Sequence, residues 1–208
     1  HKSITSLPGG CLIGARPVNY HLNALKKLGM KYEIKKGYIY ANTKGKLEGA
    51  KIRFSKISVG ATENTIIAAC LANGITTLRN CAIEPEIVDL INFLKSGGAK
   101  IKFVGKRTLK IEGIKSLKST SYEVMSDRIE AGTFCVAACL TGGNLKINNL
   151  NPKVIKTELT LLKKVGAKIK TTKKQIHIIG PKKIKNISNL VTKEYPDFPT
   201  DLQAQFMV

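Results

Sequence analysis

The chain has 208 residues, 43% of them hydrophobic, and its 35 lysines and arginines against 14 acidic residues give a net charge of +21. This length suits one large or two modest domains, and no apolar run approaches the roughly 20 residues of a membrane span. The five cysteines are odd in number and lack C-x-x-C spacing, which argues against a disulfide scaffold or a zinc site and favours the cytoplasm.

The charge leaves more than one interpretation open. Only five of the basic residues are arginines, although nucleic-acid readers favour the bidentate arginine fork. Lysines alternate with isoleucine at residues 100–102 and 168–170, a pattern typical of a solvated sheet surface. The charge therefore marks either an ordinary lysine-rich surface or a protein that binds phosphate-rich small ligands, and a basic nucleic-acid-binding module is a rival.

A loop at residues 7–17 is the first unusual segment. Its three glycines and two prolines in eleven residues exclude a helix or a central strand. A cysteine on such a loop, Cys11, is open to solvent, and the nearby Arg16 can stabilise a thiolate or a bound anion. An ordinary turn in which Cys11 is a small apolar filler explains the pattern equally well.

A unit of about 69 residues repeats along the chain. Residues 68–71 (Ala-Ala-Cys-Leu) recur at 137–140, an offset of 69, and residues 98–101 (Gly-Ala-Lys-Ile) recur at 166–169, an offset of 68. An earlier copy of the second element lies at residues 28–31. A fixed period indicates a repeated structural unit whose copies share a core.

Each copy is predicted to contain a buried helix, a strand, an amphipathic helix that ends at glycine, and two alternating strands. The amphipathic helices bury one face each, formed by Ile87, Val88, Ile91 and Leu94 in one copy and by Ile155, Leu159 and Leu162 in the next. The buried helices are expected at 65–71 and 133–140, and the strands at 32–34, 38–40, 50–54, 75–78, 101–104, 109–111, 145–147, 169–171 and 176–179. The unit is thus β-α-β-α-β-β, and residues 115–126 are the expected boundary between two domains.

Several sequence blocks occur in an order that is informative as a whole. They are Pro8-Gly9-Gly10-Cys11, Gly14-Ala15-Arg16-Pro17-Val18, His21, Ser58-Val59-Gly60-Ala61-Thr62, Glu84-Pro85-Glu86-Ile87-Val88-Asp89, Asp127-Arg128-Ile129-Glu130-Ala131-Gly132-Thr133 and Phe198-Pro199-Thr200-Asp201-Leu202-Gln203-Ala204-Gln205-Phe206. Across the whole chain these blocks resemble the enolpyruvyl transferase family, in the branch of the UDP-N-acetylglucosamine 1-carboxyvinyltransferases.

The resemblance implies an α/β fold of repeated β-α-β-α-β-β units in two domains, an inside-out α/β barrel with helices inside and sheets outside. Residues 1–125 would belong to the first domain, which carries the cysteine loop at 7–17, and residues 126–208 would begin the second. Phosphoenolpyruvate and UDP-N-acetylglucosamine would bind in the cleft between the domains, with the loop closing over them. No cofactor, metal, nucleic acid or membrane partner is expected.

The resemblance also implies the catalytic residues. Cys11 would donate a proton to the methylene carbon of phosphoenolpyruvate and can hold a covalent adduct, which suits a thiol whose pKa is tuned toward neutrality. Asp201 would accept the proton of the sugar 3-hydroxyl or orient that hydroxyl. Without the resemblance, Asp201 is also explained as a helix N-cap or an Asx-turn residue that opens the segment 202–206.

Substrate-binding residues follow by the same route. Arg16 would meet the phosphates, and a second group would frame the uracil: Pro17, Val18, Asn19 and Tyr20. The diphosphate would lie on the turn before the predicted helix, formed by Lys56, Ile57, Ser58, Val59 and Gly60, where free N–H groups and the helix dipole favour anions. An ordinary helix start also explains this turn, without any ligand. Glu84 and Asp127 match acidic positions at the cleft and hinge, although Glu84-Pro85-Glu86 also fits the first turn of a helix.

The sequence departs from the family pattern at two kinds of position. Asn19 stands where members often carry aspartate, and Tyr20 stands where they carry an aliphatic residue, so contacts to uracil are expected to differ. The Lys-Asn pair and the arginines that clamp phosphoenolpyruvate lie outside the 208 residues. The chain alone is therefore expected to be an inactive piece of a longer enzyme, and turnover above that of a Cys11→Ala variant would refute this.

The remaining cysteines and histidines are interpreted as structural. Cys70, Cys81, Cys135 and Cys139 lie in apolar segments, where free cysteine acts as a small hydrophobe. His21 and His177 are assigned no chemistry. Three rival functions stay open: transfer of enolpyruvyl to shikimate 3-phosphate, nucleic-acid binding, and non-catalytic sensing of the nucleotide sugar.

Overall fold

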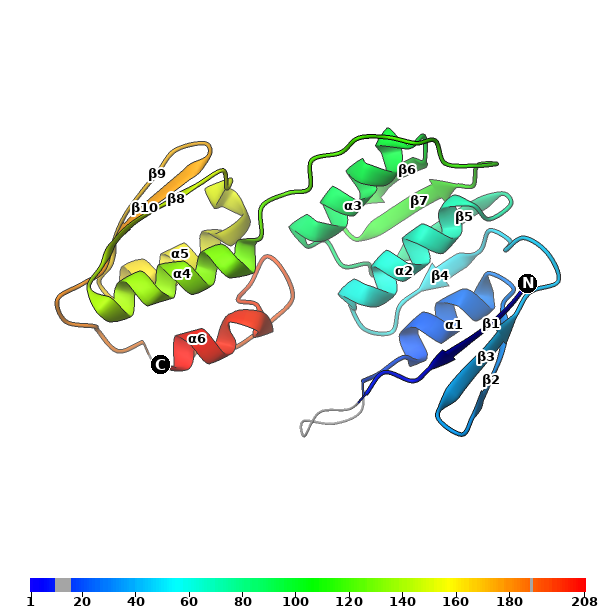
Figure 1. Cartoon of the computed structure of the whole chain (residues 1–208), viewed down its shortest axis with the longest axis horizontal. Coiled ribbons are helices and arrows are strands. Elements are labelled where there is room, and N and C mark those ends of the chain that lie inside the picture. Colours follow the sequence, from blue (N-terminus) through cyan, green and yellow to red (C-terminus); the bar gives the residue numbers. More distant parts are fainter. Residues whose placement is uncertain (10–15, 188) are drawn as a thin grey trace. The chain divides into compact units, whose positions relative to one another are not determined.

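The computed structural model describes residues 1–9, 16–187 and 189–208. Contacts divide the chain into two compact units, His1–Glu123 and Val124–Val208. The sequence placed the domain boundary after residue 125. Figure 1 labels the helices and strands of both units.

Three copies of one β-α-β-β motif form the frame of the chain. Their three sheets share one strand order, in which the last strand of the motif lies between the first strand and the middle one: β1-β3-β2, β5-β7-β6 and β8-β10-β9. The elements of the three copies are β1 (Lys2–Ser6), α1 (Asn19–Lys27), β2 (Lys31–Lys35) and β3 (Tyr38–Asn42); β5 (Ile75–Arg79), α3 (Pro85–Ser96), β6 (Lys100–Gly105) and β7 (Thr108–Glu112); and β8 (Asn144–Asn148), a 3-10 turn η1 (Pro152–Ile155), α5 (Lys156–Lys164), β9 (Lys168–Thr171) and β10 (Gln175–Ile179).

The second copy is the most complete. Strand β4 (Lys51–Arg53) pairs in parallel with β5, and helix α2 (Val59–Cys70) connects the two strands. In the third copy α4 (Arg128–Thr141) takes the place of α2. The α/β fold and its β-α-β-α-β-β unit are confirmed.

Small residues allow α2 to be buried almost along its length. Thr62, Thr65 and Cys70 are each fully buried. The two threonine hydroxyls bond back to the helix itself, to Ser58 O at 2.8 Å and to Ala61 O at 2.7 Å, and Thr62 Oγ1 also accepts the N–H of Ala82. These bonds satisfy polar groups that would otherwise be costly to bury.

Several boundaries and one helix face differ from the sequence-based expectation. Both buried helices begin about six residues earlier than predicted, at Val59 and Arg128. Val88, expected on the buried face of α3, is 41% exposed because it follows Ile87 and so points about 100° away from it. β1 and α1 were not predicted. The 3-10 turn η2 (Thr200–Leu202) and the short helix α6 (Gln203–Met207) lie where a helix was considered only in the capping explanation of Asp201.

Glycine ends the amphipathic helices as the sequence indicated. The residues that follow α1, α3 and α5 at their C-termini have positive φ: Gly29 at 101°, Gly98 at 97° and Gly166 at 111°. Glycine adopts this left-handed conformation without a Cβ clash and so suits the position.

Of the described helices, none is both long enough and apolar enough to cross a membrane.

A second glycine position allows the chain to cross over the end of a buried helix. A Cβ at Gly113, just after β7, would lie 1.5 Å from the backbone oxygen of Ala72, at the end of α2. A Cβ at Gly180, just after β10, would lie 2.1 Å from the backbone oxygen of Ala138 in α4. Both contacts are with backbone atoms, so a side chain would push the last strand away from the helix.

We expect Gly113→Ala to lower the free energy of unfolding by about 3 kcal/mol, since overpacking against backbone costs this order of energy. Gly45→Ala is the matched control, because nothing lies within 4 Å of its Cβ, and it should change stability by less than about 0.5 kcal/mol. Urea unfolding monitored by circular dichroism measures both. Equal stability of the two variants would contradict the close crossing.

Candidate functional site

Two of the predicted binding segments meet at the starts of α1 and α2. The ring of His21 in α1 lies against Gly60 in α2, whose Cβ would be 3.3 Å from His21 Cε1. Asn64 Nδ2 lies 3.3 Å from His21 Nδ1. Burial lowers the pKa of His21, so this histidine is neutral at pH 7 and serves as a packing contact. The contact brings the segment 16–20 beside the segment 56–60.

The start of α2 combines a capped helix N-terminus with nearby cations. Ser58 is the N-cap, and its hydroxyl accepts the N–H of Ala61 at 3.3 Å. The side chains of Lys56 and Arg16 are exposed on the segments that flank this end. Because this end of a 12-residue helix carries partial positive charge, it favours an anion there. The helix-start interpretation of residues 56–60 is therefore also correct, and it is compatible with anion binding.

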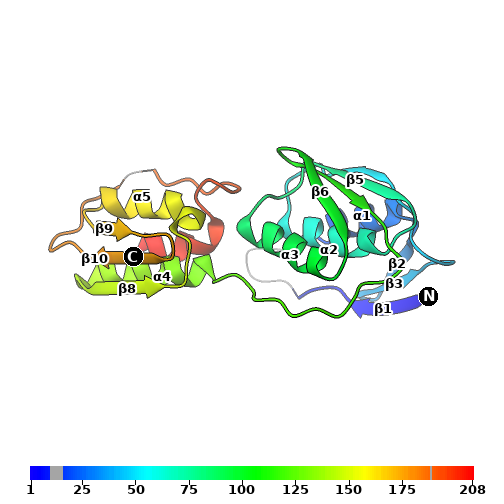
Figure 2. The same ribbon diagram turned by 90° about the horizontal axis from the view of Figure 1, so that it is seen from above.

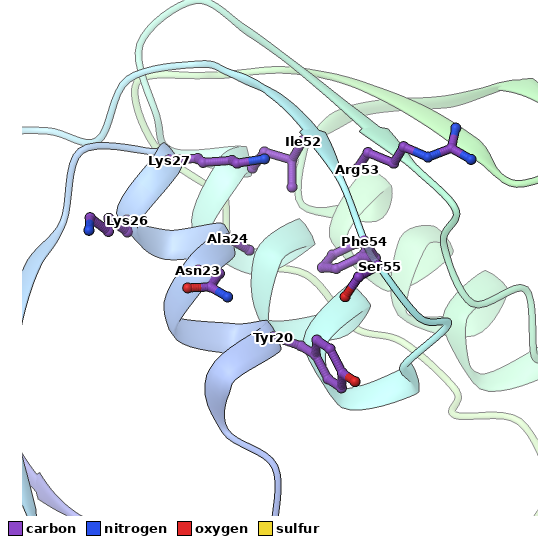
Figure 3. Close-up of a pocket in the computed structure, with 9 residues that line it drawn as sticks. All are labelled: Tyr20, Asn23, Ala24, Lys26, Lys27, Ile52, Arg53, Phe54 and Ser55. Atoms are coloured by element: carbon purple, nitrogen blue, oxygen red, sulfur yellow. The ribbon is translucent and has the colours of Figure 1, made fainter.

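A pocket of about 510 Å³ lies between α1 and β4, next to these segments. Figure 3 shows Tyr20, Asn23 and Ala24 pointing from α1 toward Phe54 and Ser55 on the opposite wall, with Lys27 reaching across one end toward Ile52. Lys26 and Arg53 lie at its margin and point away from it. The floor is apolar, whereas an amide, two hydroxyls and an ammonium group line the walls. Such a hollow fits a planar polar ring with an attached anion.

Carboxylates gather at the start of α3. Glu84 is 6% exposed at the N-cap position, and Pro85 follows it as the first helical residue, as the sequence indicated. Burial, then the charge of Glu86, then that of Glu84 raise the pKa of Glu63 in α2. The helix-start interpretation of Glu84 thus holds, and the residue also lies close to α2. No group of three or more His, Cys, Asp or Glu side chains in the described part of the chain is arranged to hold a metal ion.

In the second unit Asp127 caps α4. Its Oδ1 accepts the N–H groups of Ile129 at 2.7 Å and Glu130 at 3.0 Å. This is a structural role, which the sequence analysis did not assign to Asp127. It also fixes the start of α4 close to the segment that carries the other predicted aspartate.

Asp201 lies exposed in the 3-10 turn η2, and its side chain caps neither that turn nor α6. Two contacts hold the turn against α4. Leu202 is fully buried over Gly132, where a Cβ would lie 2.6 Å from Leu202 Cδ1, and Gln205 Nε2 donates to Thr133 Oγ1 at 3.0 Å. The capping explanation of Asp201 is therefore wrong. The structure leaves its carboxylate open to solvent on a fixed support.

Sequence reasoning missed a buried charged pair beside this support. Arg128 and Glu158 are 5% and 2% exposed, their Nη1 and Oε1 atoms are 3.8 Å apart, and the guanidinium carbon lies 5.6 Å from the ring centre of Tyr195. Burial raises the pKa of Glu158, which its backbone hydrogen bond and Arg128 partly oppose. The sequence gives little indication of this pair, because Glu158 and Tyr195 lie 30 and 67 residues after Arg128 in the chain.

Cys11, the predicted proton donor, lies outside the described residues. The other cysteines are buried, as the sequence indicated. Burial raises the pKa of Cys70 to about 11 and of Cys81 and Cys135 to about 12, and it also raises the pKa of Cys139. Protonated thiols of this kind are poor nucleophiles at neutral pH. The Nε2 atom of His177 lies 2.6 Å from the Oδ1 atom of Asn144, on the outer surface of the β8-β10-β9 sheet.

Comparisons with known proteins identify the family of the chain. The family model described as EPSP synthase (3-phosphoshikimate 1-carboxyvinyltransferase) matches residues 1–208. A UDP-N-acetylglucosamine 1-carboxyvinyltransferase of Pelagibacter ubique is 62% identical over 207 residues, and one of Ruthia magnifica is 52% identical over 205. These matches cover 100% and 99% of this chain but 49% of each relative, so the chain spans about half the length of the curated relatives it matches.

Solved structures show the same fold at low sequence identity. An enolpyruvyl transferase of Streptomyces tendae superposes with a TM-score of 0.79 at 18% identity and covers 99% of this chain and 49% of its own. An EPSP synthase of Acinetobacter baumannii gives a TM-score of 0.65 at 21% identity, over 89% of this chain and 44% of its own.

We expect Glu158→Ala to lower the free energy of unfolding by about 3 kcal/mol, because it removes a buried carboxylate that faces the buried guanidinium of Arg128. Glu33→Ala removes an exposed partner of Lys35, 3.1 Å away, and should cost less than about 0.5 kcal/mol. Thermal unfolding of both variants tests the contrast, and similar melting temperatures would show that the buried pair is not a support of this site.

Proposed function

The chain belongs to the EPSP synthase family of enolpyruvyl transferases, and from this premise we propose that it works as part of an enzyme that transfers the enolpyruvyl group of phosphoenolpyruvate to the 3-hydroxyl of UDP-N-acetylglucosamine. The observation that carries the proposal is the 62% identity, across 207 residues, to a protein named for that reaction. Phosphate would be the second product. The reaction would serve peptidoglycan synthesis in the cytoplasm.

The first unit would bind the nucleotide sugar. Its diphosphate suits the start of α2, where the exposed Lys56 precedes the helix cap Ser58 and where Gly60 contacts His21, five residues after Arg16. The uracil suits the neighbouring pocket, where Tyr20 supplies a ring for stacking and Asn23 supplies both a donor and an acceptor. An amide that both donates and accepts matches the alternating N–H and C=O groups of a uracil edge. Asn19, the first residue of α1, directly precedes Tyr20 but is not among the residues that line the pocket.

The chemistry would need one proton donor and one acceptor. The thiol of Cys11 would give its proton to the methylene carbon of phosphoenolpyruvate, while the sugar 3-hydroxyl oxygen bonds the adjacent carbon and Asp201 takes the hydroxyl proton. Loss of phosphate and of one methyl proton then restores the double bond. The exposure of Asp201 on a turn fixed by Leu202 suits a base that must reach a substrate. Glu84 and Asp127 would act at the cleft and hinge.

A second candidate is transfer to shikimate 3-phosphate, which the description of the matching family model favours. Shikimate 3-phosphate carries one phosphate group and no nucleobase, so no part of it would occupy the pocket beside Tyr20. We keep the nucleotide sugar as the proposed acceptor, because the pocket and the names of the relatives point the same way. The chain alone, at about half the length of those relatives, is proposed to bind nucleotide sugar without turnover.

Isothermal titration of the chain with UDP-N-acetylglucosamine tests the proposed acceptor. We expect binding that weakens roughly 10-fold or more in each of Arg16→Ala and Lys56→Ala, since a hydrogen bond to a charged group contributes about 1.5–3 kcal/mol. Lys44→Ala, an exposed lysine in the loop before β4, is the control and should leave the dissociation constant unchanged. Tighter binding of shikimate 3-phosphate than of the nucleotide sugar would overturn the proposal in favour of the second candidate.

A further inference from the structure

The outer surface of the β4-β5-β7-β6 sheet carries an unusual arrangement of like charges. Helices α2 and α3 pack on the inner surface of this sheet (Figures 1 and 2), so alternate residues of each strand face outward. Six cations lie on the outer surface, here called the basic face: Lys51, Arg53, Arg79, Lys100, Lys102 and Lys110.

Strand register places several of these cations directly beside one another. Lys102 is paired across the strands with Lys110, and Arg53 is paired with Arg79. Thr77 pairs with both Lys51 and Lys110, so a single row crosses all four strands with three lysines. Like charges at directly opposed positions destabilise a sheet, and a bound polyanion would relieve that repulsion.

Negative charge on the basic face is scarce. Glu112 is the one carboxylate on these four strands, and it bonds Lys100 at 2.6 Å. This hydrogen bond, then the charges of Lys100 and Lys110, lower the pKa of Glu112. Among the described ion pairs, none includes Lys51, Arg53, Arg79, Lys102 or Lys110. Most of the cations are therefore available to an external partner.

The shape of the basic face favours one class of polyanion. A shallow hollow of about 280 Å³ at its β6 edge is lined by four lysines, Lys95, Lys100, Lys102 and Lys110, and by the single carboxylate of Glu112, so its net charge is positive and suits a phosphate group. No aromatic side chain of these strands points outward, since Phe103 pairs with the inward Leu109, so the stacking that binds single-stranded nucleic acid is missing. Ile75 lies half-exposed on the same side as Glu112 and adds an apolar contact.

We propose that the basic face docks on an anionic lipid surface. Lysines spread over a sheet meet headgroups spread over a plane, and each basic residue near such a surface adds attraction that salt screens. Of the six cations of the basic face, only Arg53 borders the pocket proposed for the substrate. Docking of the basic face is therefore independent of the proposed function.

Vesicle co-sedimentation of the 208-residue chain tests this docking. The chain should sediment with vesicles of phosphatidylglycerol and phosphatidylcholine and dissociate from them in high salt. It should not sediment with vesicles of phosphatidylcholine alone. Lys51→Gln, Lys102→Gln and Lys110→Gln combined should weaken the partition roughly 10- to 100-fold. The matched control is Lys173→Gln, Lys174→Gln and Lys182→Gln combined, which removes the same charge from exposed positions in the second unit and should change the partition less than about twofold.

A charge-preserving variant, Lys51→Arg, Lys102→Arg and Lys110→Arg combined, should bind as the parent does, and circular dichroism should show the same fold in all variants. Equal losses in the glutamine variant and its control would overturn the proposal, since net charge alone would then explain binding. Binding of single-stranded poly(U) at lower protein concentrations than vesicles require would also overturn it, in favour of a nucleic-acid partner.

Discussion

The burial of α2 between its sheet and its neighbouring helices is the constraint on which the rest of the first unit depends. On the buried side of this helix polar side chains must be satisfied within the protein, which is why Thr62 and Thr65 turn their hydroxyls back onto the helix backbone, whereas Val59 and Ile67 on the other side are exposed. The same burial fixes where the helix begins. Ser58 and the loop before it therefore hold their backbone N–H and C=O groups in one fixed arrangement.

This fixed helix end explains how an ordinary structural feature can also serve as a binding site. Helix α1 packs beside it through His21 and Gly60, so the segments around Arg16 and Lys56 share one end of the unit. In the second unit the end of α4 supports Asp201 in a similar way, through Leu202 over Gly132. The repeat thus supplies rigid helix ends, and the residues that differ between copies supply the proposed chemistry.

The repeated architecture could be predicted from the sequence because its signals are local. Glycine at 98 and 166 and the alternation in each hairpin depend only on neighbouring residues. The pairing of Arg128 with Glu158 could not be predicted, since it joins two helices in space. The short strand β1 has one large apolar residue, Ile4, and so gives little signal, whereas α1 was missed although Leu22, Leu25 and Leu28 recur at helical spacing. Val88 shows that an apolar residue can fall outside the buried face of its helix. The site residues rest on family resemblance, and their roles stay proposals.

The central claim is that one reactive thiol, Cys11, acts on an alkene held at the substrate site. Mass spectrometry of the full-length protein after treatment with fosfomycin and UDP-N-acetylglucosamine tests it most directly, because the reagent reports which sulfur is accessible and activated. The account predicts an adduct on Cys11 and none on the four buried cysteines, whose raised pKa values keep them protonated. An adduct on any of those four, or an unmodified Cys11, would contradict it.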